Sequence, residues 1–414
     1  MKFNKWTIAL AAVGVVSLAS AAKAEEKTSP VLTALSSTTI SGYVDTSMEW
    51  NPGTGNAFVP PYKFNSPSKA DGFNLDVVQL RIEKPLDEQD WSAGYRVDLW
   101  FGPDANTLNT TSTGANNSDF AIRQAYVALR APVGNGLDFK VGVFDSIVGY
   151  ESVEAGKDPN FTRSYGHSIE PQTMTGVLAS YRFCDCFSMS AGVANTVGPQ
   201  INNRAFITPT GVYGPDAESY KAYMGSVALT APDSWGFLAG STLYGGIVNG
   251  YNANLGGVRP VSPVFGKNQT SYYAGATVAT PLKQVRLGAA WDYLEIEQSP
   301  GQTWAVAGYI SWQATEKLSF HGRAEYFKDG SHVLFSTPAE QITYPLTPVT
   351  SEVLDLTLTA QYDLWKNVIS RLEFRWDHSL NDSPAFGGTS YTPIFGGPTA
   401  DNAYLLALNI IYQF

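Results

Sequence analysis

Large apolar residues alternate with small or polar ones over the last eleven residues of the chain. Counting back from Phe414, every second side chain is large and apolar: Tyr412, Ile410, Leu408, Leu406 and Tyr404. Side chains of a strand point alternately to its two faces, so this pattern predicts a strand with one continuous apolar face. A soluble sheet can show such a face, but aromatic residues near both ends favour a transmembrane β-barrel, whose rims carry aromatic girdles.

The same alternation recurs far from the C-terminus. Residues 91–101 and 354–363 each place apolar side chains on one face and polar or charged side chains on the other. Trp91 and Phe101 stand at the two ends of the first apolar face. A soluble β-sandwich would share the alternation, so the aromatic ends are what favour a membrane barrel.

Segments of this kind are separated alternately by short polar turns and by long connections rich in Gly, Pro and Asn. Their approximate ranges are 38–50, 73–84, 91–102, 120–131, 137–149, 174–184, 186–197, 219–231, 236–249, 270–281, 284–297, 302–314, 317–328, 351–363, 367–380 and 402–414. We therefore predict an all-β fold, an antiparallel transmembrane β-barrel of about sixteen strands with short periplasmic turns and long extracellular loops. The first and last strands should pair, because a closed barrel leaves no unpaired edge in hydrocarbon.

The N-terminus has the pattern of an export signal. Lys2 and Lys5 precede an apolar run from Thr7 to Leu18, and Ala22 and Ala24 supply the small residues that a signal peptidase reads. We expect residues 1–24 to be a signal peptide, 25–37 a periplasmic N-terminal segment and 38–414 the barrel. No later stretch approaches the roughly 20 apolar residues of a helical span.

Composition agrees with an exported barrel that contacts outer-membrane lipid. The chain has 414 residues, of which 44% are hydrophobic and only 15% charged. The mean hydropathy of -0.12 would suit a soluble protein, but a barrel averages its apolar exterior with its polar lumen. The formal charge is -10, and loss of three lysines with the signal leaves -13. This charge argues against nucleic acid as a partner and mildly favours cations.

The sequence offers little for catalysis, metals or cofactors. Cys184 and Cys186 form a lone C-x-C, which lacks the second ligand pair of a structural zinc site. A local disulfide would suit the oxidising export compartment, and a structural turn is favoured over a redox role. The four histidines are scattered, and no nucleophile elbow or phosphate-binding loop occurs. We expect no enzyme, no metal and no cofactor.

On several predicted strands, charged residues of both signs fall on the face that is expected to point into the lumen. They are Arg81, Glu83, Arg96, Asp98, Arg323, Glu325, Arg371, Glu373 and Arg375. As a set they predict a pore lining whose field selects solutes by size and charge. Taken singly, each is better explained as a solvated or mutually paired side chain.

The connection at 150–173 is the most informative loop. Its charged residues include Glu151, Glu154, Asp158, Arg163 and Glu170. If this loop folds inward, it narrows the lumen and places its carboxylates at a pore constriction. An external loop has nearly equal weight on sequence alone.

Several runs resemble one family. The runs IRQAYVALRAPVGNGLDFKVGVFDSIVGYE at 122–151 and DPNFTRSYGHSIEP at 158–171 are similar to the bacterial outer-membrane porins of the OmpL-like β-barrel porin-2 family. The resemblance extends from SGYVDTS at 41–47 to the terminal YQF. It implies a porin-like barrel, an inward-folded third loop and a homotrimer. Asp158 and Thr162 depart from the family pattern, which puts the charge of the constriction in doubt.

The resemblance also assigns a role to the C-terminus. Tyr412 and Phe414 look like the terminal aromatic signal that outer-membrane assembly machinery recognises.

The function expected from these features is an outer-membrane porin for passive diffusion of small hydrophilic solutes and ions, with a weak cation preference. One alternative is a carbohydrate-biased channel, suggested by inward-facing Trp100 and Tyr309. A second is a non-conducting structural or adhesin barrel. Ion current across a planar bilayer separates these readings.

Overall fold

The computed structural model describes residues 38–53, 55–88, 90–110, 118–204, 220–252, 267–299, 301–335, 352–381, 383–389 and 397–414. The predicted signal peptide, residues 1–24, and the predicted periplasmic segment, residues 25–37, lie outside these ranges.

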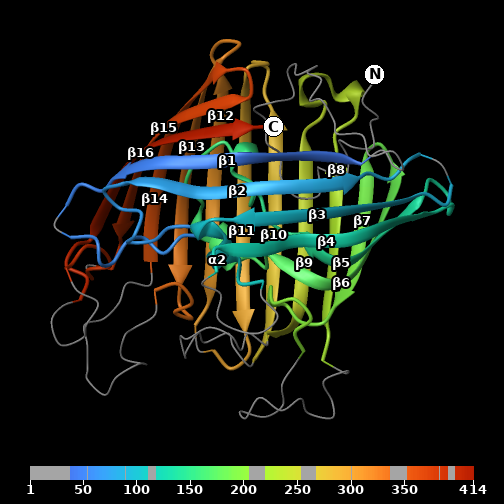
Figure 1. The fold of residues 1–414 in the computed structure, drawn as a ribbon, viewed down its shortest axis with the longest axis horizontal. Helices are drawn as coiled ribbons and strands as arrows, with labels where there is room; N and C mark the ends of the chain where they lie inside the picture. Colours follow the sequence, from blue (N-terminus) through green and yellow to red (C-terminus); the bar gives the residue numbers. More distant parts are fainter. Residues whose placement is uncertain are drawn as a thin grey trace.

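In the described residues, sixteen antiparallel strands close into one barrel (Figure 1). They are β1 (Thr39–Trp50), β2 (Phe73–Lys84), β3 (Ala93–Phe101), β4 (Phe120–Ala131), β5 (Leu137–Asp145), β6 (Thr173–Cys184), β7 (Phe187–Ala194), β8 (Ala222–Thr230), β9 (Thr242–Asn252), β10 (Lys267–Ala279), β11 (Val285–Ile296), β12 (Thr303–Gln313), β13 (Leu318–Asp329), β14 (Glu352–Trp365), β15 (Val368–Ser379) and β16 (Asn402–Gln413). Each strand pairs with its neighbours in sequence, and β1 pairs with β16. The predicted fold class and closure are confirmed.

The hydrogen bonds that close the barrel between β1 and the C-terminal strand include the last residue of the chain. The N–H of Phe414 donates to the carbonyl of Gly42 at 3.0 Å, and the N–H of Gly42 donates back to Phe414 at 2.9 Å. Tyr412 and Phe414 both keep their rings exposed on the outer surface. The apolar ridge of the last strand therefore faces outwards, as its parity predicts.

Several strand boundaries differ from the sequence prediction by two residues or more. The strand expected at 236–249 begins at Thr242, because a 3₁₀ helix, η3 (Asp233–Leu238), lengthens the preceding turn. The strand expected at 137–149 ends at Asp145, followed by one further bond to the neighbouring chain segment, from the N–H of Ser146 to the carbonyl of Gln172 at 2.7 Å. The strand expected at 219–231 shortens to residues 222–230.

Short helices occur only in connections within the described residues. α2 (Pro103–Leu108) follows β3, and η2 (Ala155–Lys157) and α3 (Tyr165–Ile169) lie between β5 and β6. No helix in these parts of the chain is long and apolar enough to cross a membrane.

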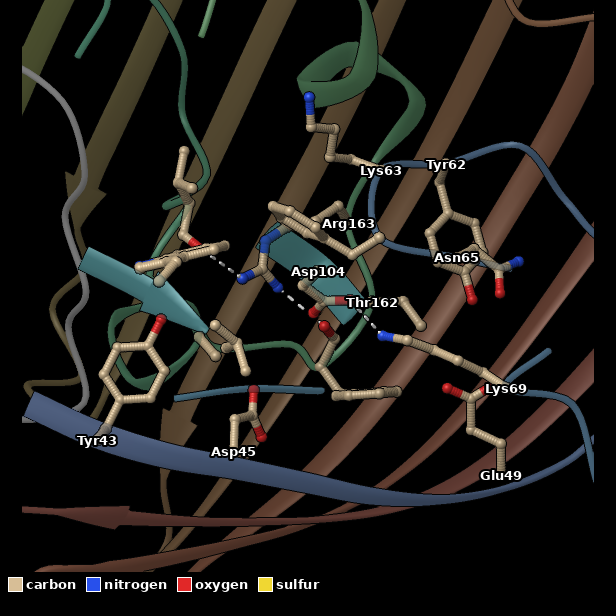
Figure 2. A pocket seen from close by; sticks show the side chains of 16 residues that line it. Tyr43, Asp45, Glu49, Tyr62, Lys63, Asn65, Lys69, Asp104, Thr162 and Arg163 are labelled. Carbon is tan, nitrogen blue, oxygen red and sulfur yellow. Dashed lines mark hydrogen bonds and ion pairs between the residues drawn. The ribbon is translucent and has the colours of Figure 1, made fainter. Parts of the chain in front are cut away.

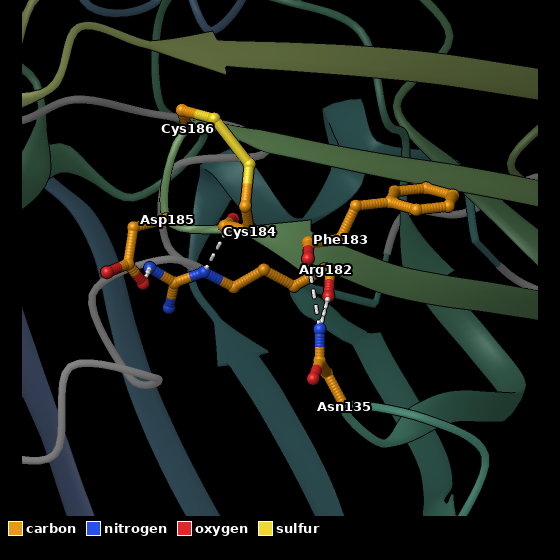
Figure 3. The surroundings of a disulfide bond; sticks show 6 residues. All are labelled: Asn135, Arg182, Phe183, Cys184, Asp185 and Cys186. Atoms are coloured by element: carbon orange, nitrogen blue, oxygen red, sulfur yellow. Dashed lines mark hydrogen bonds and ion pairs between the residues drawn. A yellow bond between two sulfur atoms is a disulfide. The ribbon is translucent and has the colours of Figure 1, made fainter.

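The β6–β7 turn contains a disulfide between Cys184 and Cys186 (Figure 3). Arg182 donates through Nε to the carbonyl of Cys184 at 3.2 Å. Asn135 of the neighbouring turn donates through Nδ2 to the carbonyls of Arg182 and Phe183, at 3.1 and 3.0 Å. The disulfide thus belongs to a turn that is already fixed by hydrogen bonds, which agrees with a structural turn.

Candidate functional site

The connection between β5 and β6, residues 146–172, is called the inner loop below. Its helix α3 contacts β11, β12 and β13, and η2 contacts β16 on the far side of the barrel. The loop therefore crosses the interior and does not lie outside the barrel. Of the two readings that the sequence left open, the structure has the inward one.

Carboxylates of the barrel wall bind the backbone of the inner loop. Glu325 on β13 accepts hydrogen bonds from the N–H groups of Tyr165 and Gly166, at 2.8 and 2.7 Å. Glu373 on β15 accepts from the N–H groups of residues 161 and 162, at 2.6 and 2.9 Å. Both carboxylates thereby satisfy main-chain donors that have no strand partner.

Arginines of the same wall bind the loop carbonyls. Arg323, Arg371 and Arg375 donate to the backbone oxygens of residues 162, 155 and 163, at 2.9, 3.0 and 2.6 Å. These five charged residues on β13 and β15 are all 1% exposed or less. The predicted lining of this wall is therefore covered by the loop, and its charges bind loop backbone. A role for these residues in contacting solutes stays a prediction.

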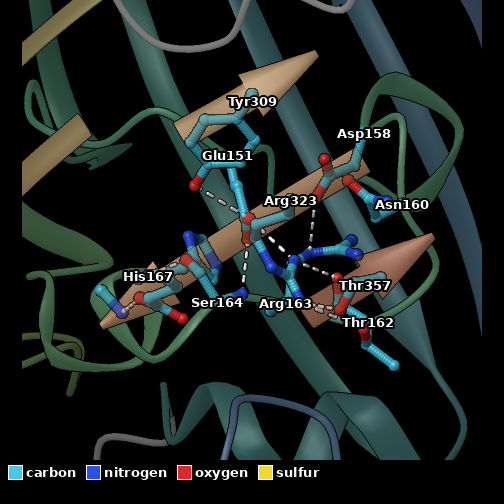
Figure 4. Close-up of polar contacts among 12 residues, drawn as sticks. Glu151, Asp158, Asn160, Thr162, Arg163, Ser164, His167, Tyr309, Arg323 and Thr357 are labelled. Carbon is cyan, nitrogen blue, oxygen red and sulfur yellow. Dashed lines mark hydrogen bonds and ion pairs between the residues drawn. The ribbon is translucent and has the colours of Figure 1, made fainter. Parts of the chain in front are cut away.

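Glu151 connects the beginning of the loop to the wall (Figure 4). Its carboxylate lies 2.9 Å from Nη1 of Arg323 and accepts a hydrogen bond from the Tyr309 hydroxyl at 3.1 Å. It also accepts from the N–H of Ser164 at 2.8 Å. Ser164 in turn caps α3, since its side chain accepts from the N–H of His167. One carboxylate thus joins both arms of the loop to β12 and β13.

Glu154 lies among four basic groups on the opposite side of the barrel. Arg81, Arg96 and Arg123 come from β2, β3 and β4, and Lys157 comes from the loop itself. Burial alone would raise the pKa of Glu154, but these cations outweigh it and hold the pKa well below its ordinary value. Glu154 is therefore ionised and ties the loop to this wall.

Asp158 and Arg163 pair within the loop, with Nε of Arg163 3.2 Å from the Asp158 carboxylate. Burial raises the pKa of Asp158 to about 7, although Arg163 acts in the opposite direction. Asp158 is thus poised between its charged and neutral forms at neutral pH.

Glu170 lies at the end of the loop, where its carboxylate is 3.2 Å from Nδ1 of His167. Burial, followed by the neighbouring Asp292, raises the pKa of Glu170 well above its ordinary value. Burial, followed by Arg163, lowers the pKa of His167 well below its ordinary value. Both shifts favour the neutral forms of the two side chains over an ion pair.

Two glycines create space for the loop. A Cβ added to Gly288 on β11 would lie 1.9 Å from the hydroxyl oxygen of Tyr150. Gly149 has a φ of +121°, and a Cβ there would lie 2.4 Å from the Glu170 carboxylate. A larger residue at Gly288 would displace Tyr150 from the wall, and one at Gly149 would strain the backbone and displace Glu170 within the loop.

Three of the four remaining predicted lining residues keep some access to the lumen. Arg81, Glu83 and Arg96 have side chains that are 12%, 32% and 19% exposed. Asp98 is fully buried and binds Arg81 and Arg96, at 2.9 and 2.7 Å. Lys157 of the inner loop, which the sequence reasoning did not single out, is the most exposed of this group at 45%.

Sequence reasoning missed Arg123, which binds Asp145 at 2.7 Å and helps to hold Glu154. The register between β3 and β4 skips Arg123, since Asp98 faces Gln124 and Leu99 faces Ile122. This β-bulge lets the consecutive residues Arg123 and Gln124 both point inward. Strict alternation cannot reveal such a pair.

The aromatic residues that suggested a carbohydrate channel are both buried. Trp100 is 1% exposed and donates through Nε1 to Gln79 at 2.8 Å. Tyr309 is 8% exposed and stacks on Tyr150, with ring centroids 4.2 Å apart. Neither ring offers an open face to a sugar.

Comparison with known families gives one match that covers the barrel. The family model described as "Putative beta-barrel porin-2, OmpL-like" matches residues 37–414. No curated protein sequence matches the chain significantly.

Solved structures with a similar fold are outer-membrane proteins. The channel DcaP of Acinetobacter baumannii has a TM-score of 0.54 at 12% identity, over 91% of this chain and 97% of that one. An anion-selective porin from Comamonas acidovorans has a TM-score of 0.53 at 12% identity, over 91% and 99%. A trimer form of OmpT of Vibrio cholerae has a TM-score of 0.52 at 11% identity, over 91% and 99%. At these identities the likeness concerns the fold.

Proposed function

Because the chain belongs to this family of OmpL-like β-barrel porins and is therefore an outer-membrane channel for small solutes, we propose that it allows passive diffusion of small hydrophilic solutes and ions through a lumen narrowed by the inner loop. The observation that carries the proposal is the loop itself, which is tied to opposite walls through Glu154 and Glu373. A segment held across the lumen limits the size of solutes. Porins are typically channels without catalytic activity, so we propose no enzymatic role.

We further propose a weak preference for cations. It rests on the net charge of -13 after signal removal. The part-exposed basic groups Arg81, Arg96 and Lys157 act against it locally. The preference is therefore expected to be small.

Purified protein in planar bilayers tests both statements. We expect stepwise ion currents and, in a KCl gradient, a reversal potential displaced slightly towards that of K⁺. Complete absence of current would exclude a channel and favour the non-conducting barrel. A reversal potential displaced towards Cl⁻ would leave the channel in place and remove the cation preference.

We also propose that the mature protein begins near Glu25, with residues 25–37 as a short periplasmic segment, and that it assembles as a homotrimer. The trimer is supported by the trimer form among the structural neighbours. Intact mass of the exported protein and light scattering of its detergent complex test these two proposals. We propose that Tyr412 and Phe414 mark the chain for the outer-membrane assembly machinery.

A further inference from the structure

A small cavity lies inside the barrel between β1, the β1–β2 connection and the inner loop (Figure 2). Its volume is about 30 Å³. A water molecule needs roughly 10–15 Å³ by this measure, so the cavity has room for about two water-sized species. A sugar ring or a nucleotide does not fit.

The cavity is rich in carboxylates. Asp45 and Glu49 on β1 and Asp104 on α2 line it, and Asp76 lies beside it. In the described part of the chain, Lys69 is the one cation that forms an ion pair with any of these four carboxylates. Its Nζ lies 2.7 Å from Asp76 and 2.6 Å from Asp104. Lys69 is therefore already paired with two carboxylates, and it forms no ion pair with Glu49.

Glu49 is the carboxylate without a partner. It is 3% exposed and lines the cavity, and its side chain makes no hydrogen bond or ion pair with the described residues. Asp45 differs, because it accepts a hydrogen bond from Asn409. A buried carboxylate without a partner destabilises the folded state by several kcal/mol unless it is neutralised.

The other cations that line the cavity are directed elsewhere. Arg163 pairs with Asp158 and donates to the carbonyls of Phe161 and Val153, at 2.8 and 3.3 Å. In Figure 2 the ammonium of Lys63 points away from Glu49. No ion pair among the described residues therefore gives Glu49 a countercharge of its own, and a bound cation or a proton can fill that role.

We propose that this cavity binds a small monovalent cation, Na⁺, K⁺ or NH₄⁺, on the Glu49 carboxylate. The cation and one water fill the available volume. No group of three or more acidic, His or Cys side chains in the described ranges is placed to hold a metal ion, so a chelated divalent metal is not assigned. The site stabilises the barrel whether or not the lumen conducts ions, and so goes beyond the channel function.

Thermal unfolding of the purified full chain tests the site. At pH 8 and constant ionic strength, chloride salts of Na⁺, K⁺ and NH₄⁺ are compared with that of N-methyl-D-glucamine, which is too large for the cavity. We expect each small cation to raise the unfolding midpoint by about 2 °C or more. Glu49→Gln should lose at least half of this rise. Glu316→Gln, which removes a charge from an exposed turn, should keep it.

Equal midpoints of the unaltered protein in all four salts would show that a proton or water occupies the cavity, and would overturn the proposal. A full rise in Glu49→Gln would place the cation elsewhere and overturn it too. If Glu49→Gln does not fold, crystals of the unaltered protein in RbCl decide, because the proposal requires an anomalous Rb⁺ peak beside Glu49. Stabilisation by cations without any bilayer current would retain this site and remove the channel proposal.

Discussion

At the scale of single residues, Asp158 shows how burial changes the chemistry of the inner loop. The carboxyl has an ordinary pKa of 3.8, and burial raises its pKa to about 7. Between these values the folded protein binds a proton that the unfolded chain does not hold. The contribution of Asp158 to the free energy of unfolding is therefore most favourable below about pH 4. This contribution is lost as the pH rises through 7.

We predict that Asp158→Asn removes this pH dependence. At pH 8 the variant should unfold at a higher temperature than the unaltered protein, because it lacks the buried charge, whereas at pH 4 the two should agree. The measurement is the midpoint of thermal unfolding in detergent at both pH values, with Glu88→Gln on an exposed turn as the control. If the two proteins differ by the same amount at pH 4 and pH 8, the Asp158 pKa is not raised.

The alternation of side chains along each strand predicted from sequence which charged residues point inward. It could not reveal which groups those residues bind. Arg323 and Arg375 were placed correctly inside the barrel, since strand alternation fixes the face. Their loop partners lie about 160 and 212 residues away in sequence, and no local pattern encodes such distances. Arg123 was missed because a β-bulge interrupts the alternation.

At the scale of elements, the strands were far more predictable than the inner loop. Each strand carries its own alternation of apolar and polar residues, which can be recognised without knowing its neighbours. The bounds of β2 and β4 were therefore predicted as they are observed. The inner loop has no periodicity, and its position depends on donors and acceptors of β13 and β15. Its inward course was therefore open until those contacts were known.

We predict that Glu373→Gln loosens the inner loop without opening the barrel. Glu373 accepts from the N–H groups of Phe161 and Thr162, and loss of its charge should weaken these bonds by about 1–3 kcal/mol. Hydrogen exchange in a peptide containing residues 159–164 should accelerate roughly 5- to 150-fold by that energy.

The control for this experiment is Glu352→Gln at the outer end of β14, where the side chain is 29% exposed. It should leave exchange in the loop peptide unchanged. Equal exchange rates in Glu373→Gln and the unaltered protein would mean that Glu373 does not hold the loop.

At the scale of the whole molecule, Phe414 closes the barrel and is also the residue that we propose for recognition by the assembly machinery. Phe414 closes the β1–β16 seam through its main-chain N–H and C=O, whereas recognition by the assembly machinery is proposed to use its exposed ring. The two roles use different atoms, so they can be separated by mutation.

We predict that Phe414→Ala folds in detergent in vitro like the unaltered protein but accumulates several-fold less in the outer membrane of cells. Deletion of Phe414 should impair both processes, because it also removes two hydrogen bonds of the seam. Folding is followed by the change in gel mobility on boiling, which reports a closed barrel, and cellular accumulation by membrane fractionation. Normal outer-membrane levels of Phe414→Ala would refute the targeting role of the ring.

The way in which β13 and β15 hold the inner loop has a consequence for variation. Glu325, Arg371, Glu373 and Arg375 bind main-chain groups, which every amino acid except proline provides in full. Side chains of the loop that make no contact with the wall or with Glu154 can therefore be exchanged while the loop keeps its path. The barrel thus offers a fixed frame on which new solute preferences could evolve, or be engineered, one surface residue at a time.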